Sequence, residues 1–148
     1  MAGEAMPRCE FDSKELLLRI DVTLAADPNA ISLVVERVME IARKMHCAEG
    51  KEFEIELALQ EALANAIQHG CKGDRSKMVQ FCVACDEKRG ILIIVRDPGQ
   101  GFDPASIPNC VMSENVFAES GRGIFLINRL MDEVSFERNG TEIRMKKS

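Results

Sequence analysis

Three polar residues in the middle of the chain recur at helical spacing. Glu61, Asn65 and His69 lie four residues apart, so a helix would carry them as one polar ridge. A carboxamide oxygen is a suitable ligand for Mg²⁺, and a carboxylate one turn away can orient or deprotonate a nucleophile. For these residues taken in isolation, a solvated helix face is the competing interpretation.

A second group of candidate residues follows an apolar run. It begins at Asp97 and ends at Phe102, with the sequence Asp-Pro-Gly-Gln-Gly-Phe. Gly99 and Gly101 would let the backbone approach a flat ligand closely, and a carboxylate at a strand end can accept a hydrogen bond from an amino group such as that of adenine. A glycine-rich turn with Asp97 as a turn residue is the simpler alternative.

A third group opens a predicted helix and reads Ser-Gly-Arg-Gly-Ile from Ser120 to Ile124. Free backbone N–H groups and the helix dipole favour phosphate at such a position, whereas an ordinary N-cap with flexible glycines is the alternative. The common phosphate loops are excluded. The chain contains no GxxxxGK[ST] sequence, and Gly99 and Gly101 lack the third glycine of a dinucleotide fold.

Apolar patterns along the chain predict the helices and strands that carry these residues. Their order predicts an α+β fold in which helices cover one face of a mixed β-sheet. The long loop over 98–120 is expected to be a functional lid. Strands are expected at about 14–25, 78–86 and 91–96 and on both sides of Asn139-Gly140, and helices from Asp27-Pro28 to Cys47, over 52–70 and after Gly123.

The first two predicted helices each carry an apolar stripe that should face the core. In the first helix the stripe consists of Ile31, Val34, Val35, Val38, Ile41, Ala42 and Met45. In the second helix it consists of Ile55, Leu59, Ala62, Leu63, Ala66 and Ile67.

The bulk composition limits the class of protein. A chain of 148 residues with 46% apolar and 29% charged residues is typical of one globular domain. Its net charge of −5 leaves no basic surplus for binding a nucleic-acid backbone directly. No apolar stretch is long enough to cross a bilayer, and the first residues lack the pattern of a signal peptide, so we expect no membrane contact and a cytoplasmic location.

The six cysteines lie mostly inside apolar runs, which favours reduced thiols over the disulfide framework of a small secreted domain. Cys82 and Cys85 stand at an odd offset in a predicted strand, so their side chains should lie on opposite faces rather than form a redox or zinc motif. The cysteines are Cys9, Cys47, Cys71, Cys82, Cys85 and Cys110.

In their order along the chain, the three groups resemble the N, G1 and G2 boxes of the GHKL ATPase superfamily, which has the Bergerat fold. ELALQEALANAIQHG resembles the N box, VRDPGQGFDP the G1 box and ESGRGIFLINRLMDEV the G2 box. The terminal GTEIRMKK is similar to the strand that closes the site, with Thr141 at the position of its usual threonine. Within the superfamily, the chain most resembles the bacterial anti-sigma-factor serine kinases of stress response and sporulation.

The resemblance implies a role for each group. Glu61 would be the general base, Asn65 the Mg²⁺ ligand and Asp97 the carboxylate that recognises adenine. Gly99 and Gly101 would shape the adenine pocket, and the G2-box residues would close the lid over the phosphates. The implied nucleotide-binding residues are Asn65, Asp97, Gly99, Gly101, Phe102, Gly121, Arg122, Gly123, Ile124 and Thr141.

The resemblance also implies what the protein does. We expect a single-domain α/β sandwich over residues 1–148 that uses ATP and Mg²⁺ to phosphorylate a serine of an anti-anti-sigma-type partner. A sigma factor as a second partner and a homodimer are further expectations. Two alternatives stay open, namely a nucleotide-dependent binding module without kinase activity and a stand-alone ATPase of the same superfamily. A histidine kinase fragment is disfavoured because neither His46 nor His69 lies in a dimerising phosphoacceptor helix.

Overall fold

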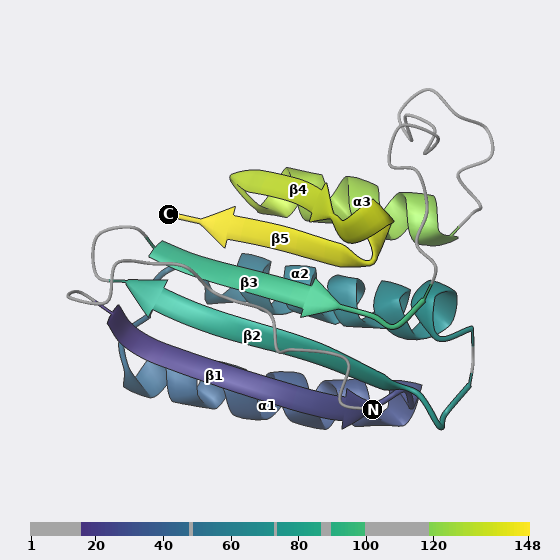
Figure 1. Cartoon of the computed structure of the whole chain (residues 1–148). Coiled ribbons are helices and arrows are strands. Elements are labelled where there is room, and N and C mark those ends of the chain that lie inside the picture. The colour runs from purple at the N-terminus through teal and green to yellow at the C-terminus, as the bar shows by residue number, and fades with distance from the viewer. Residues whose placement is uncertain (1–15, 48, 73, 87–89, 100–118) are drawn as a thin grey trace.

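Strands and helices follow one another in the order expected from the sequence (Figure 1). The computed structural model describes residues 16–47, 49–72, 74–86, 90–99 and 119–148. The elements are β1 (Leu16–Ala25), α1 (Pro28–Lys44), α2 (Glu52–Asn65), the π-helical turn η2 (Ala66–Gly70), β2 (Met78–Asp86), β3 (Gly90–Arg96), α3 (Glu119–Leu130), β4 (Glu133–Glu137), the 3₁₀ turn η4 (Arg138–Gly140) and β5 (Glu142–Lys147).

The five described strands form one sheet in the order β1-β2-β3-β5-β4. All four neighbouring pairs are antiparallel, so the expected α+β class is confirmed, whereas the expectation of a mixed sheet is wrong. Two helices lie between β1 and β2, and the chain returns from them into β2 in the direction opposite to β1. The β2–β3 and β4–β5 connections are hairpins, which join antiparallel strands by their nature.

The helices lie on one face of the sheet, as expected, and the core fills the space between the two layers (Figure 1). Alternate residues of the strands face this core, because successive side chains of a strand point to opposite faces. All six residues of the apolar stripe predicted for the second helix are buried. The core includes Val79, Phe81 and Val83 of β2, Ile91, Ile93 and Val95 of β3, Ile143 and Met145 of β5, and Ile127 of α3.

The start of α1 has the predicted cap, whereas its buried stripe is narrower than expected. The Asp27 carboxylate accepts a hydrogen bond from the Asn29 backbone N–H at 3.0 Å, and Pro28 occupies the first helical turn. Ile41 and Met45 were expected in the core but are 40% and 41% exposed. Both lie in or just after the last turn of α1, and Met45 is its C-cap.

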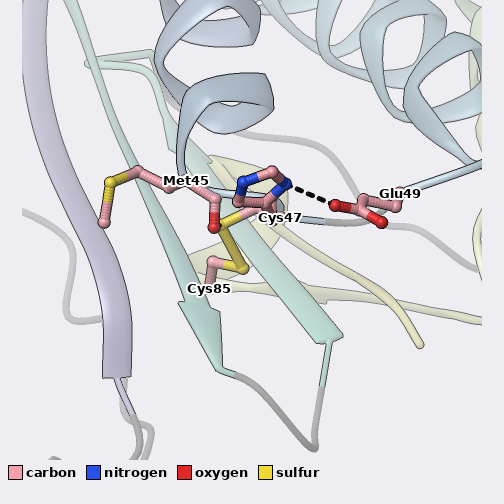
Figure 2. Close-up of a disulfide and its surroundings, with 5 residues drawn as sticks. Met45, Cys47, Glu49 and Cys85 are labelled. Atoms are coloured by element: carbon pink, nitrogen blue, oxygen red, sulfur yellow. Dashed lines mark hydrogen bonds and ion pairs between the residues drawn. A yellow bond between two sulfur atoms is a disulfide. The ribbon is translucent and has the colours of Figure 1, made fainter.

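One disulfide joins the helical layer to the sheet at the end of α1. Cys47 follows α1, Cys85 lies near the end of β2, and their sulfur atoms are bonded (Figure 2). The expectation of reduced thiols is therefore wrong for this pair, and also for Cys82, which is disulfide-bonded, whereas Cys71 is a free, buried thiol. Local sequence did not indicate the bond, because 38 positions separate the two cysteines and only the packing of α1 on the sheet brings them together.

The predicted opposite orientation of Cys82 and Cys85 is confirmed. Cys82 packs with Ala84, Leu92 and Ile94 on the face of the sheet away from the helices, whereas Cys85 packs with Cys47 under α1. Cys9 and Cys110 lie outside the described residues.

Within the described part of the chain, no helix combines the length and apolar character needed to cross a membrane.

The disulfide should contribute measurably to stability under oxidising conditions. Closing a loop of this length lowers the entropy of the unfolded chain by an amount worth about 4 kcal/mol. We expect Cys47→Ala to lower the free energy of unfolding, measured by urea titration, in buffer without a reductant. In dithiothreitol, where the wild-type bond is also broken, the loss caused by the substitution should be smaller by about that amount. Digestion without reduction, followed by mass spectrometry, should recover a peptide pair linked through Cys47 and Cys85. An equal loss of stability in both buffers would contradict the assignment.

Candidate functional site

The polar ridge of α2 faces the first half of α3. Glu61 and Asn65 are half-buried on α2, and Gly123 of α3 is buried against them. A Cβ atom added to Gly123 would lie 2.9 Å from Asn65 Nδ2 and 3.1 Å from Glu61 Oε2. The first and third residue groups, which lie far apart in sequence, therefore meet in the fold, and the absence of a side chain at Gly123 is what permits this approach.

The ridge does not continue evenly to His69. After Asn65 the helix widens into η2, where the Cys71 N–H donates to the Ala66 carbonyl in an i→i−5 pattern. A π-helical turn rotates later residues relative to α-helical spacing. His69 is exposed, whereas Glu61 and Asn65 are half-buried at α3. The ridge expected from the sequence is thus formed by two of its three residues.

The end of η2 brings Asp97 next to the same helix. Gly70 is buried and so close to Asp97 that an added Cβ would overlap the carboxylate. The Gly99 N–H donates to Asp97 Oδ1 at 2.7 Å, and a Cβ on Gly99 would meet the Gly70 carbonyl oxygen at 2.6 Å. Gly70 and Gly99 therefore both lie against the Asp97 carboxylate. Along the helix, one π-helical turn separates Gly70 from Asn65.

Thr141 joins the second group from the start of β5. The Asp97 N–H donates to the Thr141 carbonyl at 2.8 Å, which extends the β3–β5 ladder by one step. The Thr141 hydroxyl donates to the Arg138 carbonyl at 2.8 Å. This contact closes the η4 turn, in which Arg138, Asn139 and Gly140 all have positive φ. The turn predicted at Asn-Gly is confirmed, and it delivers Thr141 to the end of β3.

Sequence reasoning did not assign Cys71 to this region. Its thiol is buried beside Gly70, and burial raises its pKa, an effect to which the negative charge of Asp97 adds. The thiol is therefore neutral at pH 7 and does not compete with Asp97 as a charged group. In the sequence, its position directly after Gly70, the glycine that ends the helix, could have indicated that Cys71 lies in this region.

Several predicted site residues lie at the limit of the described chain. Gly101 and Phe102 fall outside the described residues, as does most of the expected lid, over 100–118. Gly121 and Arg122 belong to the first turns of α3, and Ile124 is half-buried on the same helix. A helix is present here as expected, but it begins at Glu119 rather than after Gly123, so the third group lies within its first turns.

The arrangement offers two chemically distinct regions along one helix. At Asp97 a carboxylate stands among backbone and small residues, which suits a flat group that carries an amino donor. At Asn65 a carboxamide oxygen lies beside a carboxylate and the first half of a helix, which suits phosphate and a hard cation. The described residues contain no cluster of three His, Cys, Asp or Glu side chains that could hold a metal.

Comparison with known proteins gives matches over most of the chain. The family model described as the histidine kinase-like ATPase domain matches residues 24–147. The chain is 30% identical to a serine-protein kinase RsbW from Bacillus pumilus, over 86% of this chain and 84% of that protein. It is 27% identical to the serine-protein kinase RsbW of Bacillus subtilis, with the same coverage of both chains, and 28% identical to that of Staphylococcus epidermidis, over 86% of this chain and 85% of that protein.

The close approach of Gly70 to Asp97 generates a test of the site. Gly70→Ala places a methyl group where the carboxylate lies and 2.5 Å from the Asp97 Cβ, so Asp97 and the strand end that carries it must shift away from the helix. We expect ATP to bind about 10- to 150-fold more weakly, the range for losing a charge-assisted hydrogen bond, while the protein stays folded. Isothermal titration calorimetry measures the affinity.

Gly50→Ala is the control for this substitution. Gly50 has positive φ, so an alanine there strains the backbone, but no atom lies within 4 Å of an added Cβ. The control should therefore lose some stability and keep its affinity for ATP. Unchanged affinity in Gly70→Ala would separate the contact with Asp97 from nucleotide binding.

Proposed function

The chain belongs to the histidine kinase-like ATPase family, and from this premise we propose that it is an ATP-dependent protein serine kinase. The observation that carries the proposal is the meeting of Glu61 and Asn65 with Gly123 of α3. Three parts that phosphoryl transfer needs lie together there. They are a base, a cation ligand and a helix that begins in a glycine-rich segment. The similarity to proteins named serine-protein kinase supports serine as the acceptor.

ATP would lie along α2 and η2, with its base at Asp97. The Asp97 carboxylate would accept a hydrogen bond from the adenine amino group, with Thr141 beside it. The phosphates would lie toward Asn65 and the first turns of α3, which contain Gly121, Arg122 and Gly123. Mg²⁺, held by Asn65 and the phosphates, would neutralise part of the charge that develops during transfer.

Glu61 is the residue that we assign to the proton transfer. Its carboxylate takes the proton of the partner's serine hydroxyl as the serine oxygen bonds to the γ-phosphorus. The bond between that phosphorus and the β–γ bridging oxygen breaks, so ADP leaves and phosphoserine forms. Phosphoryl transfer needs positioning and charge stabilisation more than covalent help from the protein. One base beside one cation ligand on a single rigid helix meets this need.

The protein substrate that we propose is an anti-anti-sigma-type partner. The support is the resemblance of the three boxes to the anti-sigma-factor serine kinases, together with an acidic net charge that argues against a nucleic-acid substrate. Sequestration of a sigma factor by a homodimer of this chain belongs to the same proposal. Binding without phosphorylation is the competing function, and the second of the two tests below distinguishes it.

Replacing Asp97 tests the adenine contact directly. Asp97→Asn keeps the size of the side chain but removes the anionic acceptor, so adenine nucleotides should bind about 1.5–3 kcal/mol more weakly. Calorimetric titration of ATP into the folded variant measures this loss. An Asp97→Asn protein that binds ATP as wild type does would exclude Asp97 from the site. Wild-type protein that binds no ATP would refute the proposed function.

Glu61 and Asn65 should affect different steps although they are neighbours on α2. Asn65→Ala should impair both ATP binding and transfer, because it removes the cation ligand. Glu61→Gln should leave ATP affinity and partner binding intact and slow single-turnover phosphorylation by roughly 10²–10⁴-fold, the usual worth of a positioned general base.

The readouts are the rate of phosphate transfer to the purified partner and the ATP affinity measured alongside. Glu56→Gln is the matched control, because Glu56 lies on the same helix but pairs with Arg43 of α1 instead of facing α3. This control should transfer phosphate at the wild-type rate. Wild-type transfer by Glu61→Gln would remove Glu61 as the base. Wild-type protein that binds ATP and partner without ever transferring phosphate would establish the binding module instead.

A further inference from the structure

A buried ion pair lies directly behind the residues proposed to recognise adenine. Arg96 is the last residue of β3 and Glu142 is the first residue of β5, and the two stand opposite each other in the ladder. Arg96 Nε and Nη2 donate to Glu142 Oε1 at 2.9 and 2.7 Å. The side chains are only 11% and 6% exposed. No part of the site described above includes this pair.

The pair sits on the face of the sheet away from the helices. Arg96 follows Leu92 and Ile94 at two-residue spacing, and Leu92 and Ile94 belong to the apolar cluster of that face. Arg144 Nη1 lies 3.7 Å from the second carboxylate oxygen of Glu142. Both oxygens of Glu142 therefore have a cationic neighbour, which fixes the rotation of the carboxylate.

At the strand ends, the residue adjacent to each member of the pair belongs to the candidate site. Asp97 follows Arg96, Thr141 precedes Glu142, and the Asp97 N–H donates to the Thr141 carbonyl. Because side chains alternate, the ion pair projects to one face while Asp97 projects toward Gly70 on the helix face. The ion pair thus holds the two strand ends together at the step where they deliver Asp97 and Thr141.

We propose that Arg96 and Glu142 are positioning residues for nucleotide recognition, which set the separation of Asp97 and Thr141 and hence the preference for adenine. This inference rests on the proposed function. The two hydrogen bonds from Arg96 restrict the position of the Glu142 carboxylate at the last step of the ladder, whereas apolar contacts of similar volume have no directional preference. Base discrimination depends on the placement of one carboxylate oxygen of Asp97. A small shift of this oxygen therefore reduces the preference for adenine, whereas a larger shift is needed to abolish binding.

The test replaces both members of the pair together, so that neither is left buried without the other. Removing one partner would strand the other, whereas replacing both members of a buried ion pair by apolar residues is often neutral for stability. The variant is therefore the double substitution Arg96→Met with Glu142→Met. The probes are ATP, which has an amino group at C6, and ITP, which has a carbonyl oxygen there, each titrated calorimetrically with Mg²⁺ present.

Wild-type protein should prefer ATP over ITP by about 10-fold or more, the contribution of a charge-assisted hydrogen bond. We expect the double variant to stay folded, to bind both triphosphates and to lose most of this preference. The matched control is Arg43→Met with Glu56→Met, which removes the Arg–Glu pair between α1 and α2. That pair does not contact Asp97 or its strand, and its loss should leave the ATP-to-ITP ratio unchanged.

The outcomes separate the two proposals. A double variant that keeps the wild-type ratio overturns the positioning role and leaves the proposed function standing. A ratio that falls equally in the control variant also overturns it, because the effect then follows from general destabilisation. Wild-type protein that binds neither triphosphate, or binds both equally, refutes adenine recognition itself and the positioning role with it. If the double variant does not fold, Arg96→Lys, which keeps the charge but not the two-nitrogen contact, should show an intermediate ratio, and a wild-type ratio in that variant overturns the role.

Discussion

The close approach of Gly70 to Asp97 is the contact on which the geometry of the site depends. It places the end of the α2–η2 helix directly against Asp97 at the end of β3. A side chain larger than hydrogen at this position would push the strand end away from the helix. Glycine is therefore required at position 70 for a steric reason, which is separate from the usual role of glycine as a helix terminator.

From this contact the remaining parts of the site follow along two directions. Along the helix, one π-helical turn leads back to Asn65 and then to Glu61, which face Gly123 of α3. Along the sheet, Asp97 pairs with Thr141, and the Arg96–Glu142 ion pair lies one residue further on. The wide π turn accounts for the exposure of His69, because it changes the rotation of the helix between Asn65 and Gly70.

The two ends of the sheet are held by different interactions. At the site end, hydrogen bonds and a buried ion pair hold β3 to β5. At the other end, near the β2–β3 connection, the Cys47–Cys85 bond ties the end of α1 to β2. The covalent tie can therefore stabilise the packing of the helices without contacting the residues assigned to chemistry.

Local patterns along the chain were enough to predict the elements, their order and much of the core. Periodicity predicted the buried stripe of α2, from Ile55 to Ile67, and the turn propensity of Asn139-Gly140 predicted the hairpin. These features depend on residues close together in the chain, whose spacing and φ preferences can be read directly. The three residue groups also indicated the candidate site, although Gly101 and Phe102 lie outside the described residues.

Which of these residues come into contact depends on long-range packing. The antiparallel sheet, the Cys47–Cys85 bond and the contact of Gly123 with Asn65 all join positions far apart in sequence. The ion pair of Arg96 and Glu142 exists because the strand register places them opposite each other, and no local pattern encodes that register. Such contacts are set by the packing of whole elements, which depends on the summed burial of many side chains rather than on the spacing of a few.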